Sequence, residues 1–187
     1  MNAQSSYTKP EAYFQRLQTI IGLNLLVQFF FLILSVGLAK SRVFLFQESQ
    51  VIIADVFGVL TPFFMVVTTV LGMFMFGKLL APIDRKPKLV DKLDQYETAA
   101  IIRWTIFAVP NIFSLIILVL TDDMIFLVYY LIMFVICGLT WPTHSNVVHN
   151  AQLNTYYALK LEEKDFDLHE KPKPPPNEAQ PDQEKSA

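Results

Sequence analysis

Four long runs of apolar residues, almost free of charge, constrain this chain more than any other feature. The runs cover 17–39, 51–77, 99–120 and 124–141. A helix needs roughly 20 mainly apolar residues to cross the hydrocarbon core of a bilayer, and the last run is close to the lower limit of about 17. Hydrophobic residues make up 53% of the chain and charged residues 17%, a balance untypical of soluble domains. The sequence therefore predicts an all-α polytopic membrane protein whose residues 17–142 form a bundle of four transmembrane helices.

Lysine and arginine in the short loops predict the orientation of these helices, because cytoplasmic loops retain such residues. One side of the predicted membrane carries Lys9, Arg16, Lys78, Arg85, Lys86, Lys88, Lys92, Arg103, Lys160 and Lys164, and the other carries Lys40 and Arg42. Trp104 and Trp141 fall at the basic side, where amphipathic rings prefer to lie. We therefore expect both termini in the cytosol.

The N-terminal segment 1–16 has two interpretations. Thr8 and Glu11 have the spacing of a capping box, and Pro10 suits a first helical turn. An interfacial helix here would place Tyr13, Phe14 and Leu17 among lipid headgroups and Arg16 on a phosphate. The alternative is a first helix that simply extends into the cytosol. The first apolar run exceeds the length of a signal-peptide core, so we expect it to remain in the protein.

The segment after the fourth run turns polar. Residues 143–168 read as one cytosolic helix capped by Thr143 or Ser145. Residues 169–187 are rich in proline and charge, which predicts a disordered tail. Between the third and fourth runs, "LTDDM" predicts a tight external turn, since aspartates cap helix starts and are costly at mid-bilayer. The alternative is one long helix with a buried acid site. It would give an odd number of spans, and the lysines and arginines would no longer lie mainly on one side of the membrane.

Helix two carries a seam of mostly small residues at intervals of four and three: Ala54, Gly58, Thr61, Met65, Thr68 and Gly72. Small residues let helix backbones approach closely, and in lipid such packing drives association. The seam can pack inside one bundle or form a homodimer interface, and the motif does not distinguish the two.

A second polar feature is a layer near the predicted midplane, formed by Gln28, Thr61, Pro62, Pro110 and Asn111. Each proline frees a helical carbonyl that must find another donor, and Gln28 and Asn111 are candidates. The layer is either interhelical hydrogen bonding around two kinks, which we favour, or a small hydrated transport site at broken helices.

Two charges lie about one turn inside the predicted spans. Asp55 is near the external end of helix two and Arg103 near the internal end of helix three. Both can reach their headgroup regions, Arg103 more easily than the short Asp55. Asp55 is either a helix-start charge or an external cation or proton site, and Arg103 is expected to anchor the cytoplasmic edge.

The sequence argues against several classes of function. The chain has one cysteine, Cys137, which excludes a disulfide framework and a thiolate metal cluster. His144, His149 and His169 lie outside the predicted bilayer, and the first two are five residues apart rather than on one helical face. No nucleotide-binding or hydrolase motif is present, and the net charge of −2 gives no basic face for nucleic acid. We expect no enzyme activity, no cofactor and no metal.

The segment "KLVDKLDQYETAAIIRWTIFAVPNIFSLIILVLTDDMIFLVYYLIMF", with the following "WPT", resembles a group of small four-helix membrane proteins of Bacteroidota. The most specific part is Tyr96, Ile101, Ile102, Arg103 and Pro110. In that group an acidic residue and a glycine often precede the proline, where this chain has Ala108 and Val109. The resemblance implies a bacterial inner membrane and supplies no activity. We therefore expect a non-catalytic accessory or scaffold protein in the lipid bilayer, with a membrane-protein partner, or alternatively a homo-oligomeric transporter or channel.

Overall fold

The computed structural model describes residues 9–41, 50–83, 86, 88–153, 155–163 and 166–169. Its helices are α1 (Pro10–Ser41), α2 (Gln50–Leu80), α3 (Leu89–Thr121), α4 (Ile125–Leu139), α5 (His144–Asn150) and α6 (Thr155–Glu162). All regular secondary structure within these ranges is helical, as the sequence predicts. The predicted disordered tail, 169–187, lies outside the described residues except for His169.

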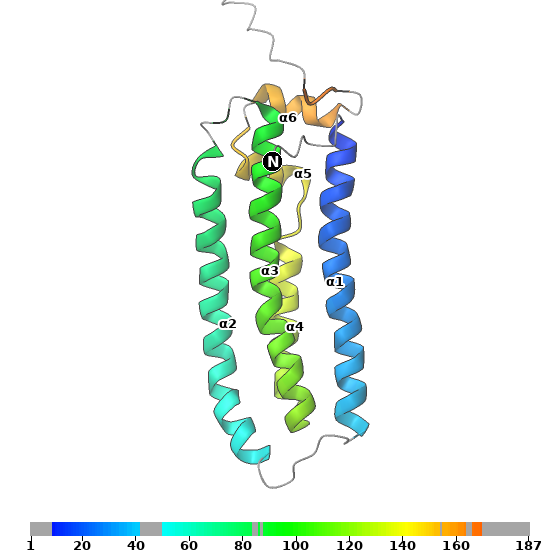
Figure 1. The fold of residues 1–187 in the computed structure, drawn as a ribbon, viewed down its shortest axis with the longest axis vertical. Helices are drawn as coiled ribbons and strands as arrows, with labels where there is room; N and C mark the ends of the chain where they lie inside the picture. Colours follow the sequence, from blue (N-terminus) through cyan, green and yellow to red (C-terminus); the bar gives the residue numbers. More distant parts are fainter. Residues whose placement is uncertain are drawn as a thin grey trace, which may run out of the picture.

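Helix α3 lies at the centre of the bundle and packs against α1, α2 and α4 (Figure 1). Helices α1 and α2 lie on either side of it, and α5 and α6 cross the end of the bundle at which α1 and α3 begin. Three helices, α1, α2 and α3, are long and apolar enough to span a membrane. A fourth span exists only if α4 and α5, which are bent by 76° relative to each other, count as one.

The predicted fourth span is shorter than its apolar run. Helix α4 has 15 residues, about 22 Å of helix against a hydrocarbon core of about 30 Å. It ends at Leu139 because Pro142 has no N–H to continue the helix and disfavours helical backbone at Trp141. Thr143 then caps α5 by accepting a hydrogen bond from the Asn146 N–H at 3.3 Å.

The single helix predicted over 143–168 is wrong in extent. The structure has two short helices there, α5 and α6, separated at 151–153. Gln152 has a φ of 50°, a left-handed conformation that ends a helix. The chain therefore folds back across the end of the bundle instead of extending away from it.

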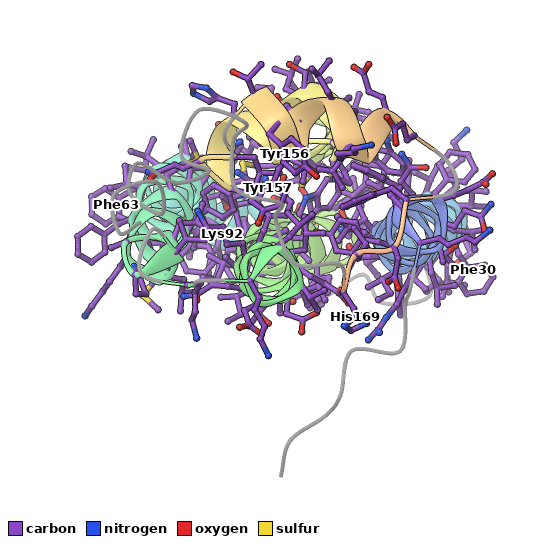
Figure 2. The ribbon with its side chains drawn as sticks, turned by 90° about the horizontal axis from the view of Figure 1, so that it is seen from above. Phe30, Phe63, Lys92, Tyr156, Tyr157 and His169 are labelled. Carbon is purple, nitrogen blue, oxygen red and sulfur yellow. The ribbon has the colours of Figure 1, made fainter. Side chains whose placement is uncertain are left out.

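The three long helices exceed the thickness of a hydrocarbon core. They have 32, 31 and 33 residues, which is about 46 to 50 Å of helix. Large exposed apolar side chains form a belt over Leu23–Leu34 of α1, Ile52–Phe74 of α2, Val109–Ile116 of α3 and Met124–Leu139 of α4. Phe30 and Phe63, in this belt, point outward on opposite flanks of the bundle (Figure 2). The excess length lies at one end, before the belt of α1 and α3 begins.

At that end the chain forms what we call the cap: residues 10–21 of α1, 76–83, 89–104 of α3, and the described residues of 144–168. One continuous apolar core joins these segments. Tyr13 and Leu17 are fully buried in it, and the Tyr13 hydroxyl donates to the Leu93 carbonyl at 3.2 Å. Arg16 forms an ion pair with Glu97, with 3.3 Å between Nε and Oε1. Of the two interpretations of segment 1–16, the interfacial helix with Tyr13, Leu17 and Arg16 on lipid is therefore wrong. Helix α1 runs continuously from Pro10, as in the alternative, and its first turns dock on α3.

The turn between α3 and α4 lies where "LTDDM" places it. Asp122 ends α3 in a left-handed conformation, with φ 54°, and its N–H donates to the Leu118 carbonyl at 2.9 Å. The Asp123 carboxylate accepts the Ile125 N–H at 2.9 Å. The first aspartate thus closes one helix and the second satisfies a free donor at the start of the next.

The seam of α2 meets α3 of the same chain over its second half. Thr61, Met65, Thr68 and Gly72 are buried, whereas Ala54 and Gly58 are half-buried. A Cβ atom on Gly72 would lie 2.5 Å from a ring carbon of Phe107, while one on Gly58 would meet nothing within 4 Å. Close approach therefore requires glycine at 72 only.

Replacing Gly72 by alanine is expected to lower the free energy of unfolding by about 1–2 kcal/mol. The added methyl group overlaps a buried ring, an overpacking cost of about 1–3 kcal/mol, against a gain in helix propensity of up to about 1 kcal/mol. Gly77→Ala is the matched control, because its Cβ meets open space. Equilibrium unfolding in mixed micelles measures both, and equal stability of the two variants would contradict the contact.

Candidate functional site

Two of the predicted midplane residues bond to each other directly. The Asn111 side-chain N–H₂ donates to Gln28 Oε1 at 2.6 Å, and Gln28 Nε2 donates to Asn24 Oδ1 at 2.6 Å. Asn111 is fully buried and Gln28 is 3% exposed. This chain of amides links α1 to α3 at a depth where lipid offers no alternative partner.

The carbonyl that Pro62 leaves free in α2 accepts a hydrogen bond from a residue that the sequence did not indicate. Pro62 has no N–H for the carbonyl of Gly58, four residues earlier. The Tyr129 hydroxyl of α4 donates to that carbonyl at 3.2 Å. The donor is therefore neither Gln28 nor Asn111, and the bond ties α2 to α4.

The remaining members of the layer, Pro110 and Thr61, form no side-chain hydrogen bond to another helix among the described residues. Pro110 is buried, and its carbonyl accepts the Ser114 hydroxyl at 2.9 Å. Thr61 is fully buried, and its hydroxyl has no hydrogen-bond partner among the described residues. The buried Asn111 Oδ1 also lacks one there. The five predicted residues thus form one amide link and one proline kink rather than a single cluster.

The amide link predicts a measurable coupling between two helices. Asn111→Leu leaves the Gln28 oxygen without its donor, and the double variant with Gln28→Leu removes both partners. A double-mutant cycle is expected to give a coupling of about 0.6–1.7 kcal/mol, the range measured for interhelical hydrogen bonds in membranes. Equilibrium unfolding in mixed micelles measures it, and additive single effects would contradict a direct bond.

The two edge charges differ in their surroundings. Asp55 is exposed on α2. Arg103, expected to reach toward headgroups, instead turns into the bundle and is only 6% exposed. Its Nη2 donates to the Thr140 carbonyl at 3.3 Å, and its Cζ lies 3.9 Å from the centroid of the Phe76 ring. The guanidinium thus lies between α2 and α4, at the level where the rings of Trp104 and Trp141 meet edge to face with centroids 6.3 Å apart.

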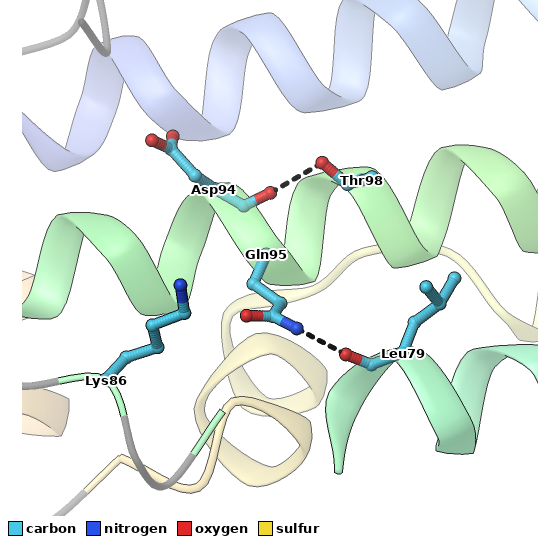
Figure 3. A pocket seen from close by; sticks show the side chains of 5 residues that line it. All are labelled: Leu79, Lys86, Asp94, Gln95 and Thr98. Atoms are coloured by element: carbon cyan, nitrogen blue, oxygen red, sulfur yellow. Dashed lines mark hydrogen bonds between the residues drawn. The ribbon is translucent and has the colours of Figure 1, made fainter. Parts of the chain in front are cut away.

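The hollows of the described surface include one in the cap and one between α2 and α4. The first, in the cap, has a volume of about 270 Å³ and is lined by Leu79, Lys86, Asp94, Gln95 and Thr98 (Figure 3). Gln95 Nε2 donates to the Leu79 carbonyl there at 2.6 Å, so this amide closes the end of α2 onto α3. The second is an apolar groove of about 320 Å³ between α2 and α4.

In the described ranges, no group of three or more histidine, cysteine, aspartate or glutamate side chains could hold a metal ion. Cys137 is fully buried within α4. His144 packs against Phe14, with ring centroids 5.6 Å apart. These residues contribute to packing at the junction of the cap and the spans.

Comparison with protein-family models, with curated proteins and with solved structures gave no match. The arrangement of the polar side chains in the helices is therefore the basis for the function proposed below.

Proposed function

We propose that the protein is a non-catalytic integral membrane protein that serves as an accessory or scaffold subunit of a larger membrane complex. One observation carries this proposal: three polar side chains inside the bundle donate hydrogen bonds to a neighbouring helix or its end. Asn111 bonds to Gln28, Tyr129 to Gly58 and Arg103 to Thr140. Groups engaged in this way hold helices together, as polar residues in membrane bundles commonly do.

The outer surface supports contact with other membrane components. Helix α1 exposes a broad apolar face, including Leu26 at 63% and Phe30 at 61%. Such a face suits lipid or a partner helix and offers no group for chemistry. We place the protein in a bacterial inner membrane, with both termini and the cap on the cytosolic side.

The cap supplies the second contact surface in this proposal. Tyr156 and Leu159 of α6 are 39% and 60% exposed, and Lys86 and Lys88 are exposed at the start of α3. Figure 2 shows α6 lying across this end of the bundle. Exposed apolar and basic side chains at one end of the bundle suit a protein partner, because interfaces combine apolar anchors with a polar rim.

Purification from the native membrane in mild detergent, followed by native mass spectrometry, tests the proposal. A larger protein bound in fixed ratio is the expected result. Leu159→Glu should reduce its recovery about tenfold, since a charge buried in an interface without a partner costs more than the 1.4 kcal/mol that a factor of ten requires. Glu162→Gln, an exposed change on the same helix, is the matched control. Recovery of a homo-oligomer alone would contradict the accessory function.

A homo-oligomeric transporter or channel is the second candidate. The observation in its favour is that Thr61 Oγ1 and Asn111 Oδ1 are buried without partners in the described part of the chain, as groups that face a permeating molecule would be. Flux through reconstituted protein, lost in folded Asn111→Leu and Gln28→Leu variants, would support this function. Unchanged or undetectable flux in all three proteins would argue against it.

A further inference from the structure

Arg103 is a buried cation for which the described residues provide no carboxylate partner. It is 6% exposed, and its Nε is buried without a hydrogen-bond partner. The structure gives its guanidinium one hydrogen bond, to the Thr140 carbonyl, and one aromatic contact, with Phe76. In the described ranges no carboxylate pairs with it. The buried carboxylate of this part of α3, Glu97, pairs with Arg16 instead.

A buried guanidinium of this kind favours an anion, because buried charges are stable only when paired. A second donor lies beside it. The Tyr96 ring meets the same Phe76 ring edge to face, with centroids 6.0 Å apart, and its buried hydroxyl also lacks a partner. The guanidinium is planar and presents several N–H groups, a geometry that matches phosphate and carboxylate.

An apolar groove lies further along the bundle, between α2 and α4, the same two helices whose ends contact this cation. Its walls include Pro62, Val66 and Val70 of α2 and Tyr129, Ile132 and Ile136 of α4. Ile136 is four residues before Thr140, and Val70 is six before Phe76, so the groove ends about 6–9 Å along the helix axes from the contacts of Arg103. The Thr69 hydroxyl meets the Met133 sulfur at 3.6 Å between the same two helices.

We propose that the groove and Arg103 together bind one lipid-like anion, with an acyl chain between α2 and α4 and a phosphate or carboxylate head on Arg103 and Tyr96. The apolar walls suit the chain, and the unpaired guanidinium suits the head. A volume of about 320 Å³ is in the range of small-molecule sites.

Native mass spectrometry of the full-length protein in mild detergent, titrated with defined lipids, tests this site. The probes are phosphatidylglycerol, phosphatidylcholine and oleate. We expect one phosphatidylglycerol, whose head is a net anion, to bind about tenfold more tightly than phosphatidylcholine, whose choline cation offsets the charge of its phosphate; a factor of ten corresponds to about 1.4 kcal/mol. Competition by oleate would identify the carboxylate of a fatty acid as a second source of the head, and its failure would restrict the site to phosphate.

Two independent sets of variants locate the binding. Arg103→Gln should abolish the preference for phosphatidylglycerol, while Lys78→Gln, an exposed cation at the same end of α2, should leave it unchanged. Ile132→Trp fills the groove and should reduce binding of both phospholipids. Val135→Trp adds the same ring to the neighbouring exposed face of α4, outside the groove, and should not.

The groove variants keep the test decisive if Arg103→Gln fails to fold, and size-exclusion profiles report folding for each variant. Equal affinity for the two phospholipids, or binding unaffected by Ile132→Trp, would overturn the proposal. So would a copurified protein whose removal is required before lipid can bind, because the groove would then belong to a partner.

Discussion

Replacing Tyr13 by alanine is expected to lower the free energy of unfolding by about 3–5 kcal/mol, the cost of truncating a large aromatic in a well-packed core. Tyr13 is fully buried in the core of the cap, together with Leu17 and Leu93. This part of α3 precedes the apolar belt, whose large exposed side chains on α3 begin at Val109. The unfolded cap therefore meets water, and both the transfer of the ring and the cavity it leaves contribute to the loss.

Equilibrium unfolding in mixed micelles measures the effect, and two variants separate its causes. Tyr13→Phe keeps the ring and removes the hydroxyl with its hydrogen bond to the Leu93 carbonyl, and it should cost about 0.5–1.5 kcal/mol. Tyr156→Ala removes a ring that is 39% exposed and should change stability by about 0.5 kcal/mol or less, as surface changes usually do. A Tyr13→Ala variant as stable as the unmodified protein would show that the start of α1 lies on the membrane surface instead of on α3.

That docked segment also marks a limit of prediction from sequence. The spacing of Tyr13 and Leu17 shows that one side of the helix is apolar, but lipid headgroups and a neighbouring helix both accept such a side. The partner of Tyr13, Leu93, is 80 residues away. The choice between the two surroundings depends on that long-range contact, which no local pattern contains.

The spans themselves were easier to predict, because a bilayer fixes the length of an apolar helix. Three of the four runs correspond to helices that meet the requirements for a span. The fourth did carry a sign of its early end, since Trp141-Pro142 interrupts the helical hydrogen bonds. Counting apolar residues up to Trp141 included two residues, Thr140 and Trp141, that lie beyond the end of α4 at Leu139.

For the polar layer, too, the sequence indicates which residues are polar but not which groups they bond to. The sequence places Gln28 in a polar layer near the predicted midplane, but its bond to Asn111 joins residues 83 apart. Tyr129 reads as one more aromatic in an apolar run, and its role follows only from the carbonyl that Pro62 frees on Gly58. A freed carbonyl predicts that a donor exists, and only the packing of α4 on α2 determines which residue it is.

Replacing Phe107 by alanine is expected to lower the free energy of unfolding by about 2 kcal/mol, roughly half the cost of the same change in a water-soluble core. Phe107 is fully buried against Gly72, where the absence of a side chain lets α2 approach α3 closely. Lipid tails are as apolar as the bundle interior, so transfer of the ring contributes little and the loss comes from the cavity and its missing contacts. Equilibrium unfolding in mixed micelles measures the effect. The control is Phe63→Ala: the Phe63 ring is 67% exposed, so lipid can fill the space that it leaves.

The pair of residues allows a stricter test, because the two changes act on one contact. Alanine at 72 is unfavourable only while the Phe107 ring occupies the space of its methyl group. In the Phe107→Ala background, Gly72→Ala should therefore cost nothing, or stabilise by up to about 1 kcal/mol through helix propensity. The double variant should be more stable than the sum of the single effects predicts, a coupling expected of residues in contact. Strict additivity would mean that the ring and the glycine are separated in the membrane, and the close packing of α2 on α3 would have to rest on other residues of the seam.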